Sequence, residues 1–530
     1  MPEYLSPGVY VEEIELGPRP IEGVSTSTAG FLGETLRGPE EPRFITGFEE
    51  FKRLYGGYVS TDASTLPFAI DGFFKNGGQR CFVGRIAHEN AAFMVADHDN
   101  KIQFRAIGPG DWANRIAAKI EPATLQVVGA QPRFKLSVMY WDVAPPQPLV
   151  DPTLPGTITD INRREPTILE VYDNLSVDSR SIDYFEKTIN GGSSLIRVDH
   201  IDATVPPTTP ANLQLGMLAA NGTPGDNGPA TGVRIDDYKG RIRPMFPPDG
   251  TSYRSGLAGF EQVDEIAIVV APDYHELDQQ YTDIITHCAT LRDRFAITHS
   301  TPGTHTLANI NGIRPPQDTT FAAFYFPWIK VFNPLINQDS LIPPSGHIAG
   351  IYAKTDVERG VFKAPANEVV VGARSLEFQI TKANQDFLNP RGVNCIRVFP
   401  ARGIRVWGAR TASTNTLWKY INVRRYFLYV GESIDEGTQW VVFEPNDERL
   451  WARVRQTITQ FLITEWRNGA LMGTKPAEAF FVKCDRTTMT QNDIDNGRLI
   501  CIIGLAAVKP AEFVIFRLTQ FQGGSEITEV

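Results

Sequence analysis

The sequence predicts a multidomain protein of the α/β or α+β class, with an α/β core and a β-rich domain inserted into it. The 530 residues exceed what one hydrophobic core usually serves, and they indicate about two to four domains. Helical patterns alternate with short apolar strands near both ends of the chain, which is typical of an α/β layer. Between them, residues 88–255 carry repeated Pro/Gly clusters and short alternating strands, which indicate a β-rich insertion.

The composition is that of a folded globular protein, with 42% apolar and 21% charged residues. A net charge of −10 argues against general nucleic-acid binding, which needs clustered positive charge. The five scattered cysteines form no CxxC pair, so we expect reduced thiols inside the cell. Because there is no signal-peptide pattern and no apolar run near ~20 residues, we expect a protein that folds in the cytosol and does not itself insert into a membrane.

The N-terminal segment, residues 1–23, contains a short extended run between prolines. Its apolar side chains suit a strand and the glutamates between them suit an exposed edge; the apolar ones are Val9, Tyr10, Val11, Ile14 and Leu16. Prolines at both ends keep the run extended. Two interpretations remain open, an edge strand of the local domain or an arm that pairs with another chain.

The first part of the core, residues 24–87, has the pattern helix, glycine stop, strand. Thr46 and Glu49 predict a capping box at the start of one helix, which Gly56 ends. A second helix over residues 66–76 is followed directly by a strand over residues 79–86. This order indicates an α/β layer.

The α/β pattern returns after the insertion. Within residues 256–390 we expect a strand, a helix and a strand at 266–270, 274–294 and 295–298, and then a short helix or turn after Pro344. We assign residues 391–510 to a C-terminal core domain, with paired strands at 395–399 and 404–407 and a buried strand at 499–503. A long amphipathic helix over 446–468 begins at Asn446, the predicted N-cap.

The last segment, residues 511–530, contains EFVIFRLTQF, ten residues without Gly or Pro that predict a strand. Val514, Phe516 and Leu518 point to one face, while Phe513 and Ile515 point to the other. A strand that is apolar on both faces is normally covered on both sides. This strand is therefore either the last one of a core or an arm donated to a neighbouring subunit.

The sequence contains no pattern that predicts catalysis. NGGQR (residues 76–80) and GPGDW (residues 108–112) lack the context of a phosphate loop, and no GxSxG or HExxH is present. His299 and His305 flank a turn without enough further ligands for zinc. We expect no enzyme activity, no metal and no cofactor.

One charged segment is distinctive, because residues 391–425 contain eight basic residues and no acid. Intramolecular pairing with acidic loops and contact with an acidic partner protein both remain open as explanations. Nucleic acid ranks third, because Trp407, Trp418 and Tyr420 suit a core better than a base-stacking platform.

Several stretches spread along the chain resemble the tail sheath proteins of contractile phage tails and related injection systems. They are LSPGVYVEEIE (5–15), FFKNGGQRCFVGRI (73–86), GIYAKTDVERGVFKAPANE (350–368), LNPRGVNCIRVFPARGIRVWGART (388–411), WKYINVRRYF (418–427), WVVFEPNDERLW (440–451), GALMGTKPAEAFFVKCD (469–485) and GLAAVKPAEFVIFRLTQ (504–520). The resemblance rests on the number and order of these stretches, and none of them is a catalytic or ligand-binding motif. Most of residues 88–255 lie outside it.

The resemblance implies a structural subunit that stacks as hexameric rings into a sleeve around an inner tube and contracts to drive the tube through an envelope. The expected partners are further copies, sheath paralogues, the tube, the baseplate and terminal cap proteins, with no nucleic acid. Residues 7–16 and 512–521 would be arms that add strands to neighbours, and the inserted domain would face outward. The C-terminal domain would lie against the tube, which makes these basic residues candidates for tube-facing or inter-subunit surface: Arg402, Arg405, Arg410, Lys419, Arg424, Arg425, Arg453 and Arg467.

Two hypotheses from other classes remain. The first is a non-contractile, self-associating capsid-like or adhesin protein that uses the same edge strands. The second is a hydrolase hidden in residues 88–255, which the absence of a familiar catalytic spacing disfavours.

Overall fold

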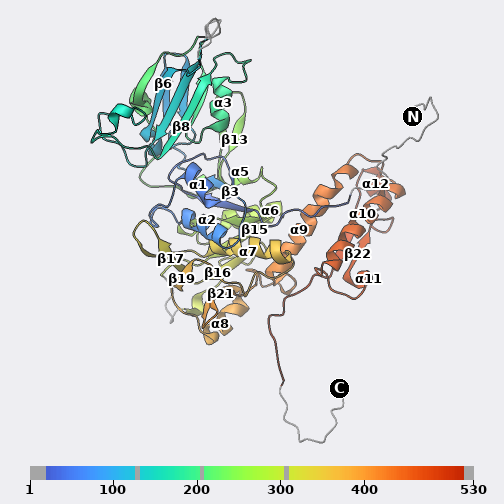
Figure 1. Ribbon diagram of the computed structural model, residues 1–530. Coiled ribbons are helices and arrows are strands. Elements are labelled where there is room, and N and C mark those ends of the chain that lie inside the picture. The colour runs from blue at the N-terminus through green and yellow to red at the C-terminus, as the bar shows by residue number, and fades with distance from the viewer. Residues whose placement is uncertain (1–19, 126–131, 203–207, 304–309, 518–530) are drawn as a thin grey trace, which may run out of the picture.

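The computed structural model describes residues 20–125, 132–202, 208–303 and 310–517. Figure 1 shows a central α/β unit with the inserted β-rich unit at one end and a helical C-terminal unit beside it. Short 3-10 turns lie at Asp111–Arg115, Pro155–Thr157, Leu218–Asn221, Tyr274–Glu276, Ile310–Gly312, Asn389–Arg391, Thr416–Trp418 and Gln439–Val441. The predicted mixed α/β class with several units is confirmed.

The central unit is built on an eight-stranded sheet in the order β2-β3-β1-β14-β15-β16-β20-β21. The strands are β1 (Ala29–Gly33), β2 (Arg43–Ile45), β3 (Cys81–Arg85), β14 (Ile268–Val270), β15 (Phe295–His299), β16 (Ala322–Phe326), β20 (Val393–Phe399) and β21 (Gly403–Trp407). The inner strands are all parallel, whereas β2 and β21 run antiparallel at the two edges. The inner strands β1, β14, β15 and β16 are buried along their whole length, as expected for a parallel sheet covered on both faces.

Helices cover both faces of this sheet. One face packs against α1 (Phe48–Tyr55), α2 (Leu66–Lys75) and α7 (Ser345–Arg359), and the other against α5 (Gly256–Phe260) and α6 (Thr282–Leu291). Helices α2 and α7 approach closely at Gly346, where a Cβ would lie 2.3 Å from the carbonyl oxygen of Ala69. Glycine is therefore required there for the two helices to pack.

Next to the sheet lies a smaller antiparallel sheet in the order β18-β17-β19. Its strands are β17 (Ile329–Asn333), β18 (Gln338–Ile342) and β19 (Ala373–Leu376), and α8 (Lys382–Leu388) follows. Val369 forms an antiparallel bridge to Arg405, so part of the β21 edge is covered within the chain.

In the described residues of the inserted unit, all neighbouring strands of the two sheets are antiparallel, and one α-helix of eight residues, α3 (Phe185–Gly192), packs beside them. Its two four-stranded sheets have the orders β10-β6-β7-β8 and β11-β4-β5-β9. The elements are β4 (Val95–His98), β5 (Ile102–Ala106), β6 (Ile116–Pro122), β7 (Phe134–Tyr140), β8 (Ile168–Leu175), α3 (Phe185–Gly192), β9 (Ile196–His200), β10 (Leu213–Met217) and β11 (Gly222–Thr223). The β-rich insertion is therefore present, with a hydrophobic core of its own.

The chain returns to the central unit earlier than residue 255. Helix α4 (Ile235–Lys239) precedes the hairpin β12 (Ile242–Pro244) and β13 (Ser252–Arg254), and Tyr238 already packs into the core on the α5/α6 face of the central sheet.

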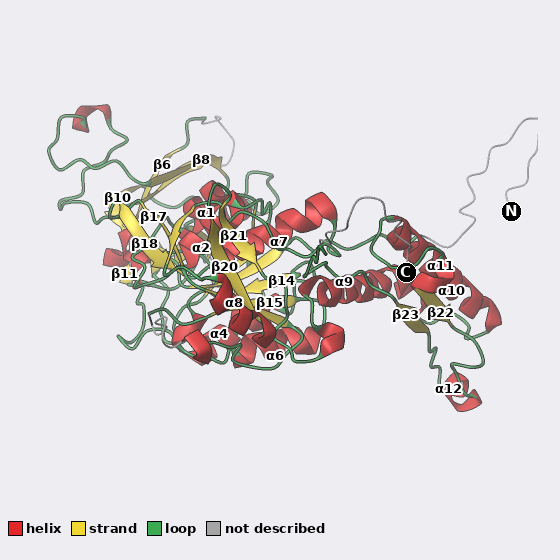
Figure 2. Ribbon diagram, turned by 90° about the horizontal axis from the view of Figure 1, so that it is seen from below, coloured by secondary structure: helices red, strands yellow, loops and turns green. Residues whose placement is uncertain are grey.

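The C-terminal unit contains α9 (Ile421–Thr438), α10 (Glu448–Arg467), α11 (Pro476–Ala479), α12 (Gln491–Asp495) and the two-stranded antiparallel sheet β22 (Phe480–Lys483) and β23 (Ile502–Leu505). The amphipathic stripe of α10 forms much of the core of this unit, together with residues of α9. Figure 2 shows β22 and β23 lying next to α10 at the end of the molecule that is opposite the inserted unit.

Several sequence-based predictions of local structure were wrong. The boundary at residue 391 falls inside the central unit, because β20 and β21 complete its sheet. The helix predicted over residues 274–294 is interrupted at Tyr281, whose φ of 53° is left-handed, and only α6 remains. The short helix or turn predicted after Pro344 is a helix of 15 residues, α7, and is therefore longer than expected.

Two predicted caps are also wrong. Gly47 is the N-cap of α1, and the Thr46 hydroxyl donates to Glu50 at 2.8 Å instead of capping the helix. The carboxylate of Asp447, the residue after Asn446, accepts from the first backbone amides of α10. Asn446 instead accepts a hydrogen bond from the indole of Trp451.

Among the described residues, no helix has the length and apolar character required to cross a bilayer. The same part of the chain contains no group of three or more His, Cys, Asp or Glu side chains arranged to hold a metal ion.

Candidate assembly surfaces

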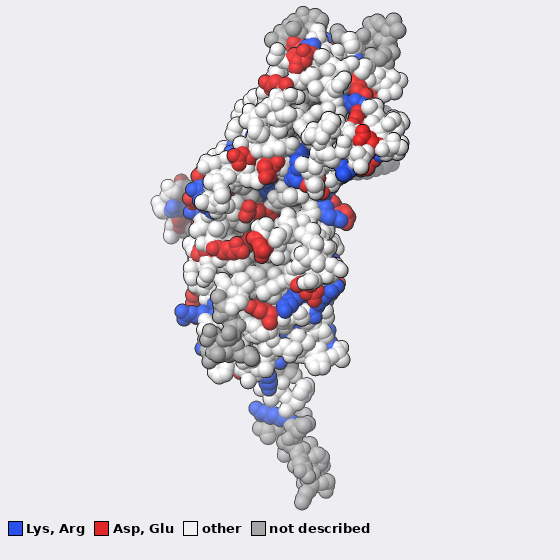
Figure 3. All heavy atoms as spheres, turned by 90° about the vertical axis from the view of Figure 1, so that its left-hand side faces the viewer, with Lys and Arg blue, Asp and Glu red and all other residues white. Residues whose placement is uncertain are grey.

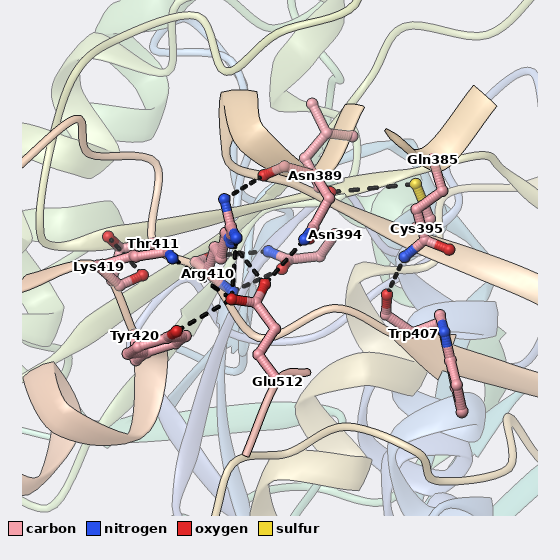
Figure 4. Close-up of polar contacts among 11 residues, drawn as sticks. Gln385, Asn389, Asn394, Cys395, Trp407, Arg410, Thr411, Lys419, Tyr420 and Glu512 are labelled. Atoms are coloured by element: carbon pink, nitrogen blue, oxygen red, sulfur yellow. Dashed lines mark hydrogen bonds and ion pairs between the residues drawn. The ribbon is translucent and has the colours of Figure 1, made fainter. Parts of the chain in front are cut away.

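The C-terminal segment leaves the body of the protein at a fixed point, Glu512 (Figure 4). Its carboxylate accepts from Arg410 Nε at 2.7 Å and Nη2 at 2.8 Å, which is the bidentate geometry that arginine favours. The hydroxyl of Tyr420 donates to it at 2.9 Å and the amide of Asn389 at 2.8 Å. The ammonium group of Lys419 lies 3.4 Å away. We call this group of residues the Glu512 anchor.

Electrostatics strongly favour the charged form of Glu512. Burial raises the pKa of this carboxyl, but the hydrogen bonds from Arg410 and Asn389 and the charge of Arg410 outweigh it and lower the pKa to about 2. Arg410 is itself held, because its backbone amide donates to Asn394 and its Nη1 donates to the carbonyl of Asn389. The anchor thus joins the C-terminal segment to the end of the central sheet.

The four side chains that follow Glu512 are exposed to solvent. Phe513, Val514, Ile515 and Phe516 are exposed by 70%, 68%, 78% and 85%. As far as Arg517, the described part of the predicted strand pairs with none of the described strands. The interpretation as the last strand of its own core is therefore wrong for residues 513–516, whereas Leu518 lies outside the described residues. The arm interpretation stays a prediction.

The N-terminal segment is described only from Pro20, so the predicted arm with Val9, Tyr10, Val11, Ile14 and Leu16 lies outside the described residues. From there the chain follows α9 toward the central unit. Ile21 packs against Gly437, where a Cβ would lie 2.7 Å from its side chain, and the backbone amide of Val24 donates to Ser433 Oγ at 3.1 Å.

A buried ion pair fixes this segment to two helices. Arg425 of α9 contacts the carboxylate of Asp356 of α7 through two hydrogen bonds of 2.9 and 2.6 Å, and both side chains are only 3% exposed. Thr26 completes the group, because its hydroxyl donates to Asp356 and its carbonyl accepts from Arg425. Burial raises the pKa of Asp356, and the charge of Arg425 opposes that shift. We call this the Asp356 junction.

The predicted basic surface is therefore only partly a surface. Arg410 and Arg425 are buried and paired inside the chain, which corrects their assignment as exposed contact residues. Arg424 is half-buried with its guanidinium 4.0 Å from the Phe321 ring centre, and burial lowers its pKa to about 10. Lys419 faces Glu512.

The remaining candidates are more accessible. Arg402 and Arg405 both hydrogen-bond to Asn367 in front of β21. Arg402, Arg453 and Arg467 are exposed. Figure 3 shows acidic and basic side chains intermixed on one face of the molecule, without an extended region of one sign.

The sheet β22–β23 is the least complete part of the described structure. In residues 20–517 as described, neither of its strands has a second strand as neighbour. Its inner face packs on α10, whereas Phe481 and Ile502 on the outer face are 50% and 47% exposed. Such a sheet offers both an edge and an apolar face to an added strand.

Solved structures similar to this chain include contractile sheaths. The helical sheath of the anti-feeding prophage in the contracted state aligns with 98% of this chain and 99% of its own, at 24% identity and a TM-score of 0.56. The sheath complex of the extracellular contractile injection system PVC, also contracted, aligns over the same shares at 22% identity and the same TM-score of 0.56. The fold is thus the one found in subunits of contractile sheaths.

Comparison of sequences leads to the family. The phage tail sheath protein central domain matches residues 248–412, and the phage tail sheath C-terminal domain matches residues 413–521. These adjacent matches cover more than half of the 530 residues, and the chain belongs to the phage tail sheath protein family. Their common boundary lies between β21 and α9, where the structure also passes from the central to the C-terminal unit.

Curated relatives match over shorter stretches. A tail sheath protein of Burkholderia phage BcepMu is 28% identical over 159 residues, which cover 28% of this chain and 33% of the relative. A putative prophage major tail sheath protein of Pseudomonas aeruginosa is 26% identical over 200 residues, which cover 36% of this chain and 49% of the relative. The matched region therefore spans less than half of either relative.

Proposed function

We propose that this protein is the repeating subunit of a contractile sheath, which polymerises as stacked hexameric rings around an inner tube and contracts to drive that tube through a target envelope. One observation carries the proposal: four consecutive large apolar side chains, Phe513–Phe516, are exposed directly after the Glu512 anchor. Exposed apolar segments of this kind mark interaction sites. Because Glu512 is held in place, the segment that follows it would extend in a defined direction, toward a neighbouring subunit.

The proposed contact is strand addition between copies of this chain. The segment after Glu512 would pair with an edge of the β22–β23 sheet of a neighbour, and the N-terminal arm with residues 7–16 would pair with a second copy. Main-chain hydrogen bonds would set the register, and apolar pockets would set specificity. Support comes from the two open edges and from the exposed Phe481 and Ile502 on the same sheet.

Contraction requires subunits to turn while these strands stay paired. The joint that bends would lie after Glu512 and not at residues 508–510, because Val508 and Glu512, on either side of Lys509 and Pro510, are both held within the chain. The backbone amide of Val508 donates to Ala470 at 3.1 Å, and Asn422 donates to the carbonyl of Val508 at 3.1 Å. Subunits would then move as rigid bodies on short connections, and a small free-energy difference for each would add up along the sheath.

The proposed partners are further copies of the chain, sheath paralogues, the tube protein, the baseplate and terminal cap proteins, with assembly in the cytosol. Exposed Arg402, Arg453 and Arg467 are candidates for contact with the tube or a neighbour. The inserted unit lies at the end of the molecule opposite the C-terminal unit, as Figure 1 shows, which suits an outward position.

The test is electron microscopy of sheaths formed by purified variants. Deletion of residues 513–530 or of residues 2–16 is expected to leave a folded, soluble protein and to abolish long sheaths. A finer variant combines Phe513→Glu with Ile515→Glu, which places charge on the proposed arm without shortening it. Its matched control combines Ile161→Glu with Ile182→Glu, since these side chains are 85% and 88% exposed in the inserted unit.

We expect sheaths of normal length from the control and none from the arm variants. Normal sheaths from both deletions would overturn the arm assignment. Closed shells, or cylinders that never shorten, would favour the non-contractile alternative.

A further inference from the structure

Two cysteines of the C-terminal unit face each other across the β22–β23 sheet. Lys483 pairs with Ile502 at the end of the ladder, so the next two residues in register are Cys484 and Cys501. Because side chains alternate along a strand, both thiols point to the same face as Val482 and Ile503, toward α10. Directly opposed residues of an antiparallel pair have Cβ atoms roughly 4.5–5.5 Å apart, close to the distance that a disulfide spans.

The backbone beyond the two cysteines is also held. The hydroxyl of Thr488 donates to the carbonyl of Ile500 at 2.8 Å and accepts from the amide of Asp485 at 3.2 Å. Cys484 and Cys501 therefore lie between two cross-links, the last pair of the ladder on one side and the Thr488 contacts on the other. Neither cysteine can move far from its partner without breaking one of them.

The chemical surroundings differ from those of the other cysteines. Cys484 is buried and Cys501 is half-buried, so the pair can be reached from solvent through Cys501. A hydrogen bond from the Cys501 thiol, helped by the nearby Arg455, lowers the pKa of Cys484, which favours the reactive thiolate. Cys81, Cys288 and Cys395 are fully buried in the central unit, and burial raises the pKa of both Cys288 and Cys395 to about 12.

We propose that Cys484 and Cys501 are a redox-sensitive pair, which is reduced in the cytosol and forms an intrachain disulfide when the protein meets a low-molecular-weight disulfide in an oxidising medium. In the first step a thiolate of the pair attacks a sulfur of the small disulfide, which gives a mixed disulfide and releases one small thiol. The second cysteine then attacks the mixed disulfide and releases the other small thiol. The two electrons and the two thiol protons of the cysteines end on the small thiols.

The bond would close a loop that contains α12, which Figure 2 shows at the far end of the connection between β22 and β23. A crosslink of this kind restricts the unfolded chain and so stabilises the folded unit. The disulfide would lie at the end of the β22–β23 ladder. Oxidation would therefore hold β22 and β23 together and keep the edges of this sheet in one arrangement. The proposal does not depend on sheath assembly, because the pair lies within one chain.

The test exposes the folded, full-length subunit to oxidised glutathione without denaturant. Remaining thiols are then blocked with N-ethylmaleimide in denaturant and mapped by peptide mass spectrometry. We expect two of the five thiols to be lost and one linked peptide pair to contain Cys484 and Cys501, while Cys81, Cys288 and Cys395 are alkylated. The oxidised protein should also have a higher Tm than the same protein after reduction.

Trypsin provides a second measurement, because Arg486 and Arg498 lie inside the loop. Fragments cut there should stay joined on a non-reducing gel and separate after reduction, and Cys501→Ser should abolish the joining. Five alkylated thiols in the folded, glutathione-treated protein would overturn the proposal. A disulfide between Cys501 residues of two chains would overturn it as well.

Discussion

The eight-stranded sheet of the central unit and the two-stranded sheet β22–β23 belong to the same chain but differ in completeness. The first is covered on both faces by helices, and its parallel strands are flanked by antiparallel strands at both edges. The second is covered on one face only, and in the described residues no further strand flanks it.

The difference shows that one chain combines a core sheet that is covered on both faces with a sheet that leaves apolar surface exposed. Burial of apolar side chains stabilises the central unit without any partner. The outer face of β22–β23 and the segment Phe513–Phe516 leave apolar surface in water, which a partner strand can bury. The Asp356 junction and the Glu512 anchor connect the two units, so their removal tests how strongly the incomplete unit depends on the complete one.

The largest expected effect is that of breaking the Asp356 junction. Arg425→Ala leaves the Asp356 carboxylate buried without its partner, and loss of one member of a buried pair costs about 3–5 kcal/mol. We expect a lower free energy of unfolding in urea and a separation of the C-terminal transition from that of the central unit. Arg453→Ala is the control, because that side chain is 52% exposed.

An unchanged transition in Arg425→Ala would mean that the junction does not couple the two units. A second variant, Asp356→Leu with Arg425→Met, replaces both charges by apolar side chains of similar size and is expected to recover part of the loss.

The sequence allowed the central sheet to be predicted in outline because its signals are local. The strands Cys81–Arg85 and Phe295–His299 are apolar runs next to glycine or helix ends, and α2 ends at the expected place. Helix α9 was missed, because its polar residues Asn422, Arg425 and Ser433 are buried and interrupt the apolar pattern. These residues contact the N-terminal segment, α7 and Val508, and no local pattern reports such contacts.

The candidate site was predictable only in part for the same reason. The apolar character of residues 513–516 could be read from the sequence. Their exposure could not, because it depends on whether a partner strand covers them. The Glu512 anchor could not be foreseen, since Glu512 lies 102 residues from Arg410 and 123 residues from Asn389 in the sequence. Charge counting identified Arg410 and Arg425 as unusual, but only the fold determines that their partners lie within the chain.

The second prediction concerns the Glu512 anchor and its dependence on pH. The folded-state pKa of Glu512 is lowered to about 2 from 4.5, so its contribution to stability is present above pH 4.5 and is lost as the pH falls toward 2. Glu512→Gln keeps the shape of the side chain but removes the charge. The free-energy difference between the two proteins should be largest above pH 4.5 and vanish toward pH 2, measured by urea unfolding at several pH values.

The same variant sharpens the comparison of the two units. If the Glu512 anchor holds only the start of the C-terminal segment, Glu512→Gln should leave the unfolding of the central unit unchanged. The same substitution should increase the rate of amide hydrogen exchange in residues 508–512. A difference that stays constant across the whole pH range would contradict a role for the charge of Glu512.

The smallest expected effect lies in a hollow where α9 meets the central unit. Asp264, Asp293, Glu432 and Glu436 line this hollow next to Arg425. Burial, followed by the charges of Asp293, Asp435 and Glu436, raises the pKa of Glu432 to about 7 from 4.5. Since the folded state binds the proton more tightly, stability falls as the pH rises from 4.5 to 7.

Glu432→Gln should remove that loss. We expect a Tm above that of the unchanged protein at pH 8 and no difference below pH 4.5, measured by differential scanning calorimetry. Glu358→Gln, at an exposed position of α7 that does not line the hollow, is the control that separates a general reduction of negative charge from the effect of the half-buried Glu432. Equal gains from both variants would assign the effect to net charge, and the contact between α9 and the central unit would then be insensitive to this proton.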